Sequence, residues 1–269
     1  MTTGYLHTQD EIGKACDIIE SFLGQHFFKK GIEELKDNDP SGSGMGRQSF
    51  PPGSSRLVML WNRAREELAF GELGGCFTPG ISSAIMGALG KYLETLASAP
   101  KIKEAAMGLM ENHSFDSTLF TLSIAFGFSL LSRKPSFSSA PGCSFTVADS
   151  YIAGCLCPAA TTPLRDIPLK AAEFAGRLAG ENIPGPGLEH ILYIDLSYCG
   201  EPLEIIRDML ADTPPENFSV PGLETAAVIP CKISFNRITG GVIMNTSGLP
   251  VFLDNAAENA YRSGEIYIP

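Results

Sequence analysis

The sequence predicts an α/β protein, with a mixed α+β arrangement as the alternative. Apolar residues recur at helical spacing through the first part of the chain, whereas short β-rich runs alternate with helical patterns after about residue 137. The 269 residues include 44% hydrophobic and 19% charged side chains, as in an ordinary folded protein. We therefore expect a helical N-terminal region followed by a small mixed sheet flanked by helices.

The N-terminal half is predicted to consist of helices separated by one long loop. Helical spacing occurs in residues 12–23, 57–68 and 81–96, and the apolar run at 115–131 predicts a buried helix. Residues 38–55 are rich in Ser, Gly and Pro and have no hydrophobic period, which is typical of a flexible loop or linker. The expected organisation is an N-terminal helical segment at 1–37, the loop at 38–55, a helical region at 56–112 and an α/β region at 113–269.

The C-terminal half is predicted to alternate strands and helices. SFTVADSYIAGCLC predicts two short strands or a hairpin, PLKAAEFAGRLAG predicts a helix, and HILYIDLS is the clearest buried strand. A further helix is expected over EPLEIIRDMLA and a last short one over residues 255–263. The remaining strands are expected over AAVIPCKISF, GGVIMN and PVFL.

Charge and cysteine content restrict the kind of protein. The net charge is −10, and residues 136–269 hold only 7 Lys and Arg against 15 Asp and Glu, which disfavours a nucleic-acid-binding face. The longest apolar run, Leu119–Leu131, is shorter than the ~20 residues that span a bilayer. Seven scattered cysteines without a CxxC pair are typical of a reducing compartment. We expect a soluble, cytoplasmic protein that has protein partners and no membrane association.

The order of elements after residue 114 follows that of a nuclease fold. The matching elements, in order, are the buried helix at 115–131, the strand VADSYIAG, the helix PLKAAEFAGRL, the strand HILYIDLS and the closing strands at 226–260. Over these elements, about half of the chain resembles the PD-(D/E)XK, or restriction-endonuclease-like, family. This resemblance implies Mg²⁺ held by carboxylates and water attack on a phosphodiester. It implies catalytic roles for Asp149 on the strand, for Asp116 near the start of the first helix, and for Lys170 as a displaced lysine.

One position departs from the family pattern. A Glu-x-Lys pair should follow Asp149 on the next strand, and the chain has Cys155-Leu156-Cys157 there instead. Thiolates prefer softer metals than Mg²⁺. The resemblance therefore implies a catalytically impaired, nuclease-like protein that acts as a binding or scaffold component. A structural or protein-interaction module unrelated to nucleases is the alternative, in which Asp149 is a surface turn carboxylate.

Two further groups of residues are candidates for a site. Cys155 and Cys157 would share one face of a strand, and they could bind zinc with His190 or Cys143, as in a thiol- or zinc-dependent enzyme. The alternative is that they are buried thiols that act as small hydrophobes. Asp195 and Ser197 end the HILYIDLS strand, where ligands bind in open α/β sheets. The alternative for Asp195 is a loop-start carboxylate bonded to its own backbone.

Overall fold

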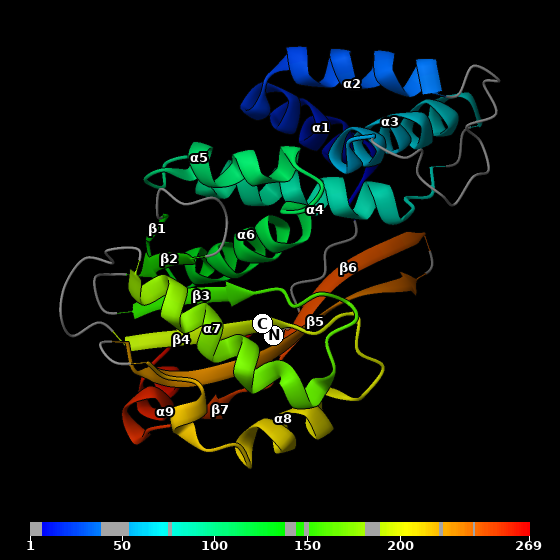
Figure 1. Cartoon of the computed structure of the whole chain (residues 1–269). Coiled ribbons are helices and arrows are strands. Elements are labelled where there is room, and N and C mark those ends of the chain that lie inside the picture. Colours follow the sequence, from blue (N-terminus) through cyan, green and yellow to red (C-terminus); the bar gives the residue numbers. More distant parts are fainter. Residues whose placement is uncertain are drawn as a thin grey trace.

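The N-terminal helices form the upper part of the molecule in Figure 1, and helices cover both faces of the sheet below them. A computed structural model describes residues 7–38, 54–74, 77–137, 144–147, 151–180, 189–220, 223–238 and 240–269. Asp149 and most of the predicted loop at 38–55 lie outside these described residues. The N-terminal helices are α1 (Gln9–Leu23), α2 (Gln25–Asn38), α3 (Arg56–Gly74), α4 (Ile81–Leu96), α5 (Ile102–Ala106) and α6 (Phe115–Leu130), with a 3-10 turn at Met107–Met110.

Local sequence signals set the bounds of the first helix. The Thr8 hydroxyl accepts the N–H of Glu11 at 3.3 Å, and the Glu11 carboxylate accepts the N–H of Thr8 at 2.8 Å, which is a reciprocal capping box. Gly24, with φ of 100°, ends α1 in a conformation that side chains with a Cβ rarely adopt. Gln25 then begins α2 at once.

Helix α6 is buried around nearly its whole circumference, as its unbroken apolar composition predicts. Its hydroxyl side chains donate back to carbonyls of the same helix, as Thr121 does to Ser117 at 2.8 Å and Ser123 to Phe120 at 2.7 Å. Polar groups of this helix are thus accommodated in the apolar interior.

The sheet is mixed, in the order β1-β2-β3-β4-β5-β6, with β7 pairing on β5. β1, β2 and β3 are antiparallel to one another, whereas β3, β4 and β5 are parallel and are joined through helices. The strands are β1 (Pro135–Phe137), β2 (Ser144–Val147), β3 (Tyr151–Leu156), β4 (Glu189–Asp195), β5 (Thr225–Ile238), β6 (Gly241–Gly248) and β7 (Val251–Phe252). The later helices are α7 (Ile167–Gly180), α8 (Leu203–Ala211) and α9 (Asn255–Arg262).

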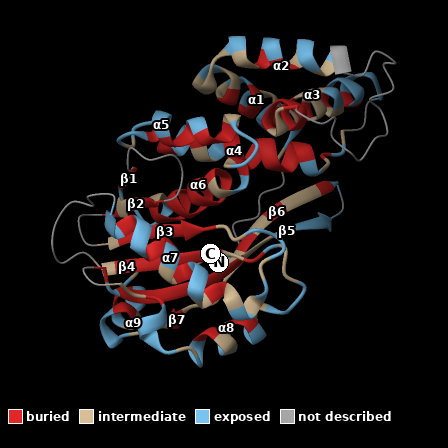
Figure 2. Ribbon diagram, in the orientation of Figure 1, coloured by how far each residue is buried: buried red, intermediate tan, exposed pale blue. Residues whose placement is uncertain are grey.

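Each face of the sheet has its own apolar core, and the strands divide their side chains between the two by simple alternation (Figure 2). Cys155, Ile191 and Tyr193 face the core shared with α4 and α6. Leu156, Leu192 and Ile194 face the core shared with α7 and α8. The first core also runs through α1 and α3, so the N-terminal helices and the sheet are packed together.

Strand β5 is longer than the predicted AAVIPCKISF, and its proline marks a change of partner. β7 pairs with β5 before Pro230 and β6 pairs with it from Cys231 onward. A proline has no N–H to give to a sheet ladder, and it is tolerated here because the neighbouring strand changes at this point. Strand β1 was not predicted.

The predicted class is confirmed: the chain is a mixed α/β protein with helices in its N-terminal region and a mixed sheet flanked by helices. None of the described helices combines the length and the apolar character needed to cross a membrane.

Candidate functional site

The carboxyl ends of the parallel strands bring together residues from three parts of the chain. Asp195 is the last residue of β4 and lies beside Cys231 of β5, and Cys157 follows the last residue of β3. The N–H of Leu196 donates to the carbonyl of Cys231 at 2.8 Å, which holds the strand end in place. The predicted residues Asp195 and Ser197 therefore meet Cys157 at this edge of the sheet.

The two oxygens of the Asp195 carboxylate have different hydrogen-bond partners. Oδ1 accepts the N–H of Ser197 at 2.9 Å and the Ser197 hydroxyl, and the same hydroxyl oxygen accepts the N–H of Ile233 at 2.7 Å. Oδ2 lies 4.0 Å from the thiol of Cys157. The loop-start hydrogen bonds expected of an Asp at this position are thus present, and the second oxygen faces the space beside β3.

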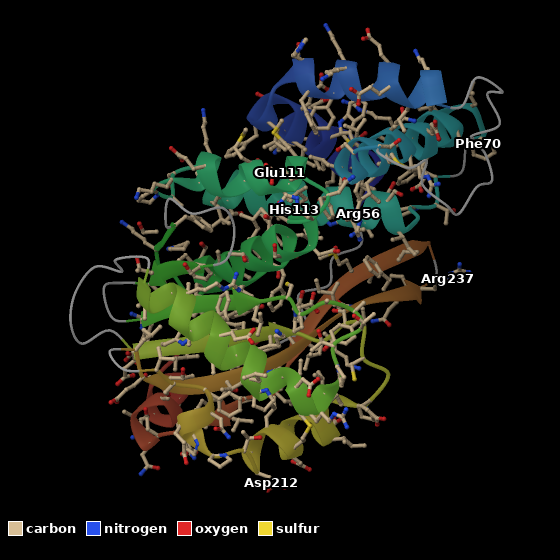
Figure 3. All side chains as sticks on the ribbon, in the orientation of Figure 1. Arg56, Phe70, Glu111, His113, Asp212 and Arg237 are labelled. Atoms are coloured by element: carbon tan, nitrogen blue, oxygen red, sulfur yellow. The ribbon has the colours of Figure 1, made fainter. Side chains whose placement is uncertain are left out.

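Burial raises the pKa of Asp195, the hydrogen bonds from Ser197 oppose this, and the charge of Asp116 adds to it. Asp116 stands in the first turn of α6, exposed, and its carboxylate accepts from Arg56 Nη1 at 2.5 Å. Arg56 also lies over the Phe115 ring, 4.8 Å from its centroid, and is labelled where α3 meets the start of α6 (Figure 3). Asp116 thus acts on Asp195 through its charge, but it has a counter-ion of its own in Arg56.

Lys232 lies on β5 next to the carboxyl ends of the parallel strands, and it stabilises a loop. Its Nζ donates to the carbonyl of Cys199 at 2.5 Å and to that of Glu201 at 2.6 Å, which fastens the loop after β4 to β5. Among the described residues, no Lys or Arg nitrogen lies within ion-pair distance of the Asp195 carboxylate.

Cys155 and Cys157 lie toward the same core, as alternation predicts, but His190 does not join them. Cys155 is fully buried against α6, whereas the His190 ring packs on Gly154 and on Phe174 of α7, across the sheet. No group of three possible metal ligands occurs in the described residues. The predicted trio of Cys155, Cys157 and His190 is not assembled.

The structure separates the remaining nuclease candidates. Lys170 is an exposed residue of α7, and its Nζ lies 2.8 Å from the Glu173 carboxylate. Helix α7 covers the face of the sheet opposite to α6, which carries Asp116. Asp149, the third member, lies outside the described residues.

Sequence reasoning missed Arg56 and Lys232. A charged residue inside the apolar run AAVIPCKISF was a visible signal for Lys232, because a lysine in a buried strand needs acceptors. Arg56 follows a loop and gives no local signal, since its ion-pair partner is 60 residues away in the chain.

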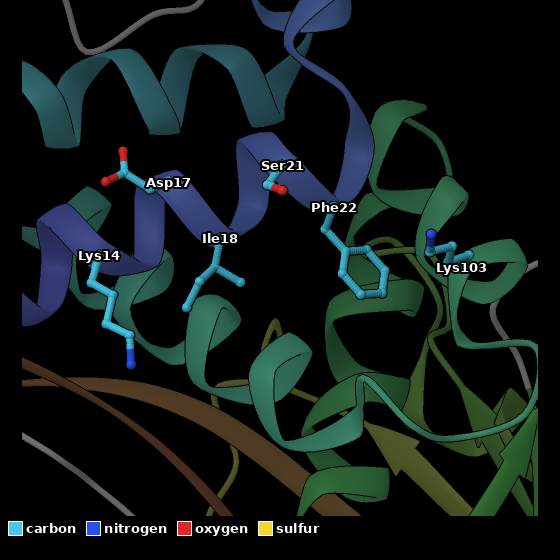
Figure 4. Close-up of a pocket in the computed structure, with 6 residues that line it drawn as sticks. All are labelled: Lys14, Asp17, Ile18, Ser21, Phe22 and Lys103. Carbon is cyan, nitrogen blue, oxygen red and sulfur yellow. The ribbon is translucent and has the colours of Figure 1, made fainter.

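A concave surface lies on the helical region, apart from the sheet. It is a shallow groove of about 400 Å³ between α1 and α5 (Figure 4). Its lining residues are Lys14, Asp17, Ile18, Ser21, Phe22 and Lys103.

Asp195→Asn is expected to stabilise the protein by about 1 kcal/mol near pH 8, the usual size of such a gain. The pKa of Asp195 is raised in the native state, so the native state binds the proton more tightly than the unfolded chain does. The stability of the wild type therefore falls as the pH rises above the pKa that Asp195 has in the unfolded chain. Asparagine keeps the Oδ1 acceptor for Ser197. Urea unfolding at several pH values measures the gain, which should shrink as the pH falls towards about 4. Asp116→Asn, which loses the ion pair with Arg56, should show no gain, and an equal gain there would contradict this account.

Comparison of the chain with family models, with curated proteins and with solved structures finds no match.

Proposed function

We propose that the protein is a non-catalytic, nuclease-like component that binds a partner protein rather than cleaving a nucleic acid. The observation that carries this proposal is the content of the position where the nuclease family has Glu-x-Lys. Cys155 is fully buried there, and Cys157 contacts a carboxylate. Neither thiol supplies the hard oxygen ligand and the cation that Mg²⁺-dependent cleavage uses.

The charged groups nearby support the same conclusion. Asp116 is paired with Arg56, Lys170 with Glu173, and Lys232 is bound to two backbone carbonyls. A catalytic lysine must reach the reacting phosphate, and a lysine that closes a loop through two hydrogen bonds is not positioned for this. The balance of −8 in residues 136–269 also opposes the approach of a polyanion.

Protein is the partner class that agrees with these properties. Asp195 is a largely buried carboxylate that lies at a strand end and has no cation within reach among the described residues. Such a group is held at a cost in stability, which is typical of residues kept for function rather than for folding. It would accept a hydrogen bond or a cationic side chain from a bound protein.

The expected result of a nuclease assay is no cleavage. Single- and double-stranded DNA and RNA are each incubated with the protein and Mg²⁺ or Mn²⁺. Their cleavage by the wild type should not exceed their cleavage by an Asp149→Ala variant purified in parallel. The paired variants control for contaminating nuclease, because a contaminant cleaves equally in both. Cleavage by the wild type that Asp149→Ala abolishes would overturn the proposal and establish an active nuclease.

A further inference from the structure

The groove between α1 and α5 has an apolar floor and cationic ends. Ile18 and Phe22, one helical turn apart on α1, are half-buried and pack against the main core. Lys14 lies one turn before Ile18, and Lys103 of α5 lies at the other end beside Phe22 (Figure 4). Along α1 the stretch from Lys14 to Phe22 covers about 12 Å, which is slightly more than two helical turns.

The charges around this groove do not cancel. Arg65 lies against two acids, the Asp17 carboxylate and, at 3.7 Å, that of Glu20, so these three groups together keep one negative charge. At one end of the groove two lysines share one acid, because the positive charges of Lys14 and Lys91 both interact with Glu94. The Glu94 carboxylate accepts a hydrogen bond from Lys14 at 2.7 Å. Both lysines lower the pKa of Glu94.

At the other end the Lys103 ammonium has no ion-pair partner within the described ranges. The groove region therefore keeps a balance of +1 in a chain whose net charge is −10, from Lys14, Lys91, Lys103 and Arg65 against Asp17, Glu20 and Glu94.

We propose that this groove binds an acidic amphipathic helix of a partner protein. A helix laid along α1 would place apolar side chains on Ile18 and Phe22 and acidic side chains near Lys14 and Lys103, about seven residues apart. The groove is shallow and runs along one side of a helix, which suits a helix better than an enclosed small molecule. The complementary charge selects an acidic partner and repels a basic one.

This site is distinct from the edge of the sheet around Asp195, and no residue of the sheet lines it. The inference uses no feature of the nuclease resemblance. The outcome of the nuclease assay therefore leaves it unaffected, and the two proposals fail separately.

The test uses two synthetic helical peptides that differ only in charge. One carries Leu and Phe one turn apart between two Glu residues seven positions apart, and the other has Lys in place of each Glu. Titration of the full chain at low ionic strength should give binding of the Glu peptide with Kd of about 10–100 µM and much weaker binding of the Lys peptide. Equal affinity for both peptides, or no binding of the Glu peptide, would overturn the proposal.

A pair of charge reversals locates the binding. Lys103→Glu should weaken the Glu peptide at least about fivefold, whereas Lys170→Glu, the same change of net charge on exposed α7, should alter affinity by less than about twofold. NMR spectra of the wild-type chain should show the largest shifts at Ile18 and Phe22. Equal weakening by both variants, or shifts that do not include α1, would show that the peptide binds by net charge elsewhere.

Discussion

Acidification from about pH 6.5 to about pH 4 is expected to remove about 3 kcal/mol of stability through His190 alone. The ring is fully buried between β3 and α7, and burial lowers its pKa to about 4 from an ordinary value of 6.5. Between these two pH values the unfolded chain binds the proton and the native chain does not. Stability therefore falls as the pH is lowered, and the loss is complete below about pH 4.

The surroundings of His190 explain why the ring stays neutral. Nδ1 lies 3.1 Å from the hydroxyl oxygen of Thr225, and that hydroxyl donates to the Phe218 carbonyl at 2.6 Å. Nδ1 therefore carries the proton and donates to Thr225. Nε2 is buried without a hydrogen-bond partner and packs against Gly154 and Phe174. No charged side chain contributes to the pKa shift, so a proton on Nε2 would place an unpaired charge in an apolar core.

Urea unfolding of wild type, His190→Asn and His113→Asn between pH 4 and pH 7.5 measures the effect. Asparagine at 190 keeps a donor for Thr225 and cannot titrate, so this variant should lose most of the slope. His113→Asn is the matched control, because it makes the same substitution at an exposed imidazole outside the core. A wild-type slope that survives in His190→Asn would assign the pH dependence to other groups. Asp195 is not one of them, because its raised pKa makes stability fall as the pH rises.

Much of the fold could be predicted because its signals are local. The capping box at Thr8, the apolar run of α6 and the β-rich HILYIDLS each specify an element without reference to distant residues. The last three residues of β5, 236–238, could not be predicted, because they form a strand only through pairing with β6. Tertiary pairing, rather than propensity, decides such segments.

The candidate site could likewise be predicted only in part from the sequence. The position of Asp195 at a strand end follows from sequence, and so does the common face of Cys155 and Cys157. The face that His190 occupies depends on how β4 aligns with β3, where His190 lies opposite Ile152 and Tyr193 opposite Cys155. Register between strands is set by the whole sheet, so a set of ligands drawn from two strands cannot be chosen from spacing within either one.

Gly127→Ala is expected to destabilise the protein by about 3 kcal/mol, at the upper end of the cost of overpacking a core. Gly127 lies within α6, where alanine is otherwise the better residue by about 1 kcal/mol. A Cβ at this position would lie 2.0–2.4 Å from three ring carbons of Tyr267, far inside van der Waals contact. The glycine is required because the C-terminal tail packs its ring directly on the helix backbone.

The ring cannot move away cheaply, because hydrogen bonds fix the tail at Tyr267 itself and at Pro269. The Tyr193 hydroxyl donates to the carbonyl of Tyr267 at 2.7 Å in the buried core, and the N–H of Gly248 donates to the carbonyl of Pro269 at 2.9 Å. Relief of the clash would break the first of these bonds and leave a buried hydroxyl without a partner. The substitution is therefore expected to loosen the tail as well as to lower stability.

A matched glycine and a double-mutant cycle separate packing from helix propensity. Gly176→Ala in α7, where no atom lies within 4 Å of the new Cβ, should stabilise the chain by up to about 1 kcal/mol. In a Tyr267→Ala background the clash is absent, so Gly127→Ala should become neutral or stabilising, with a coupling energy of about 2–3 kcal/mol. Equal costs of Gly127→Ala in the two backgrounds would place its effect within α6 rather than at the contact with the tail.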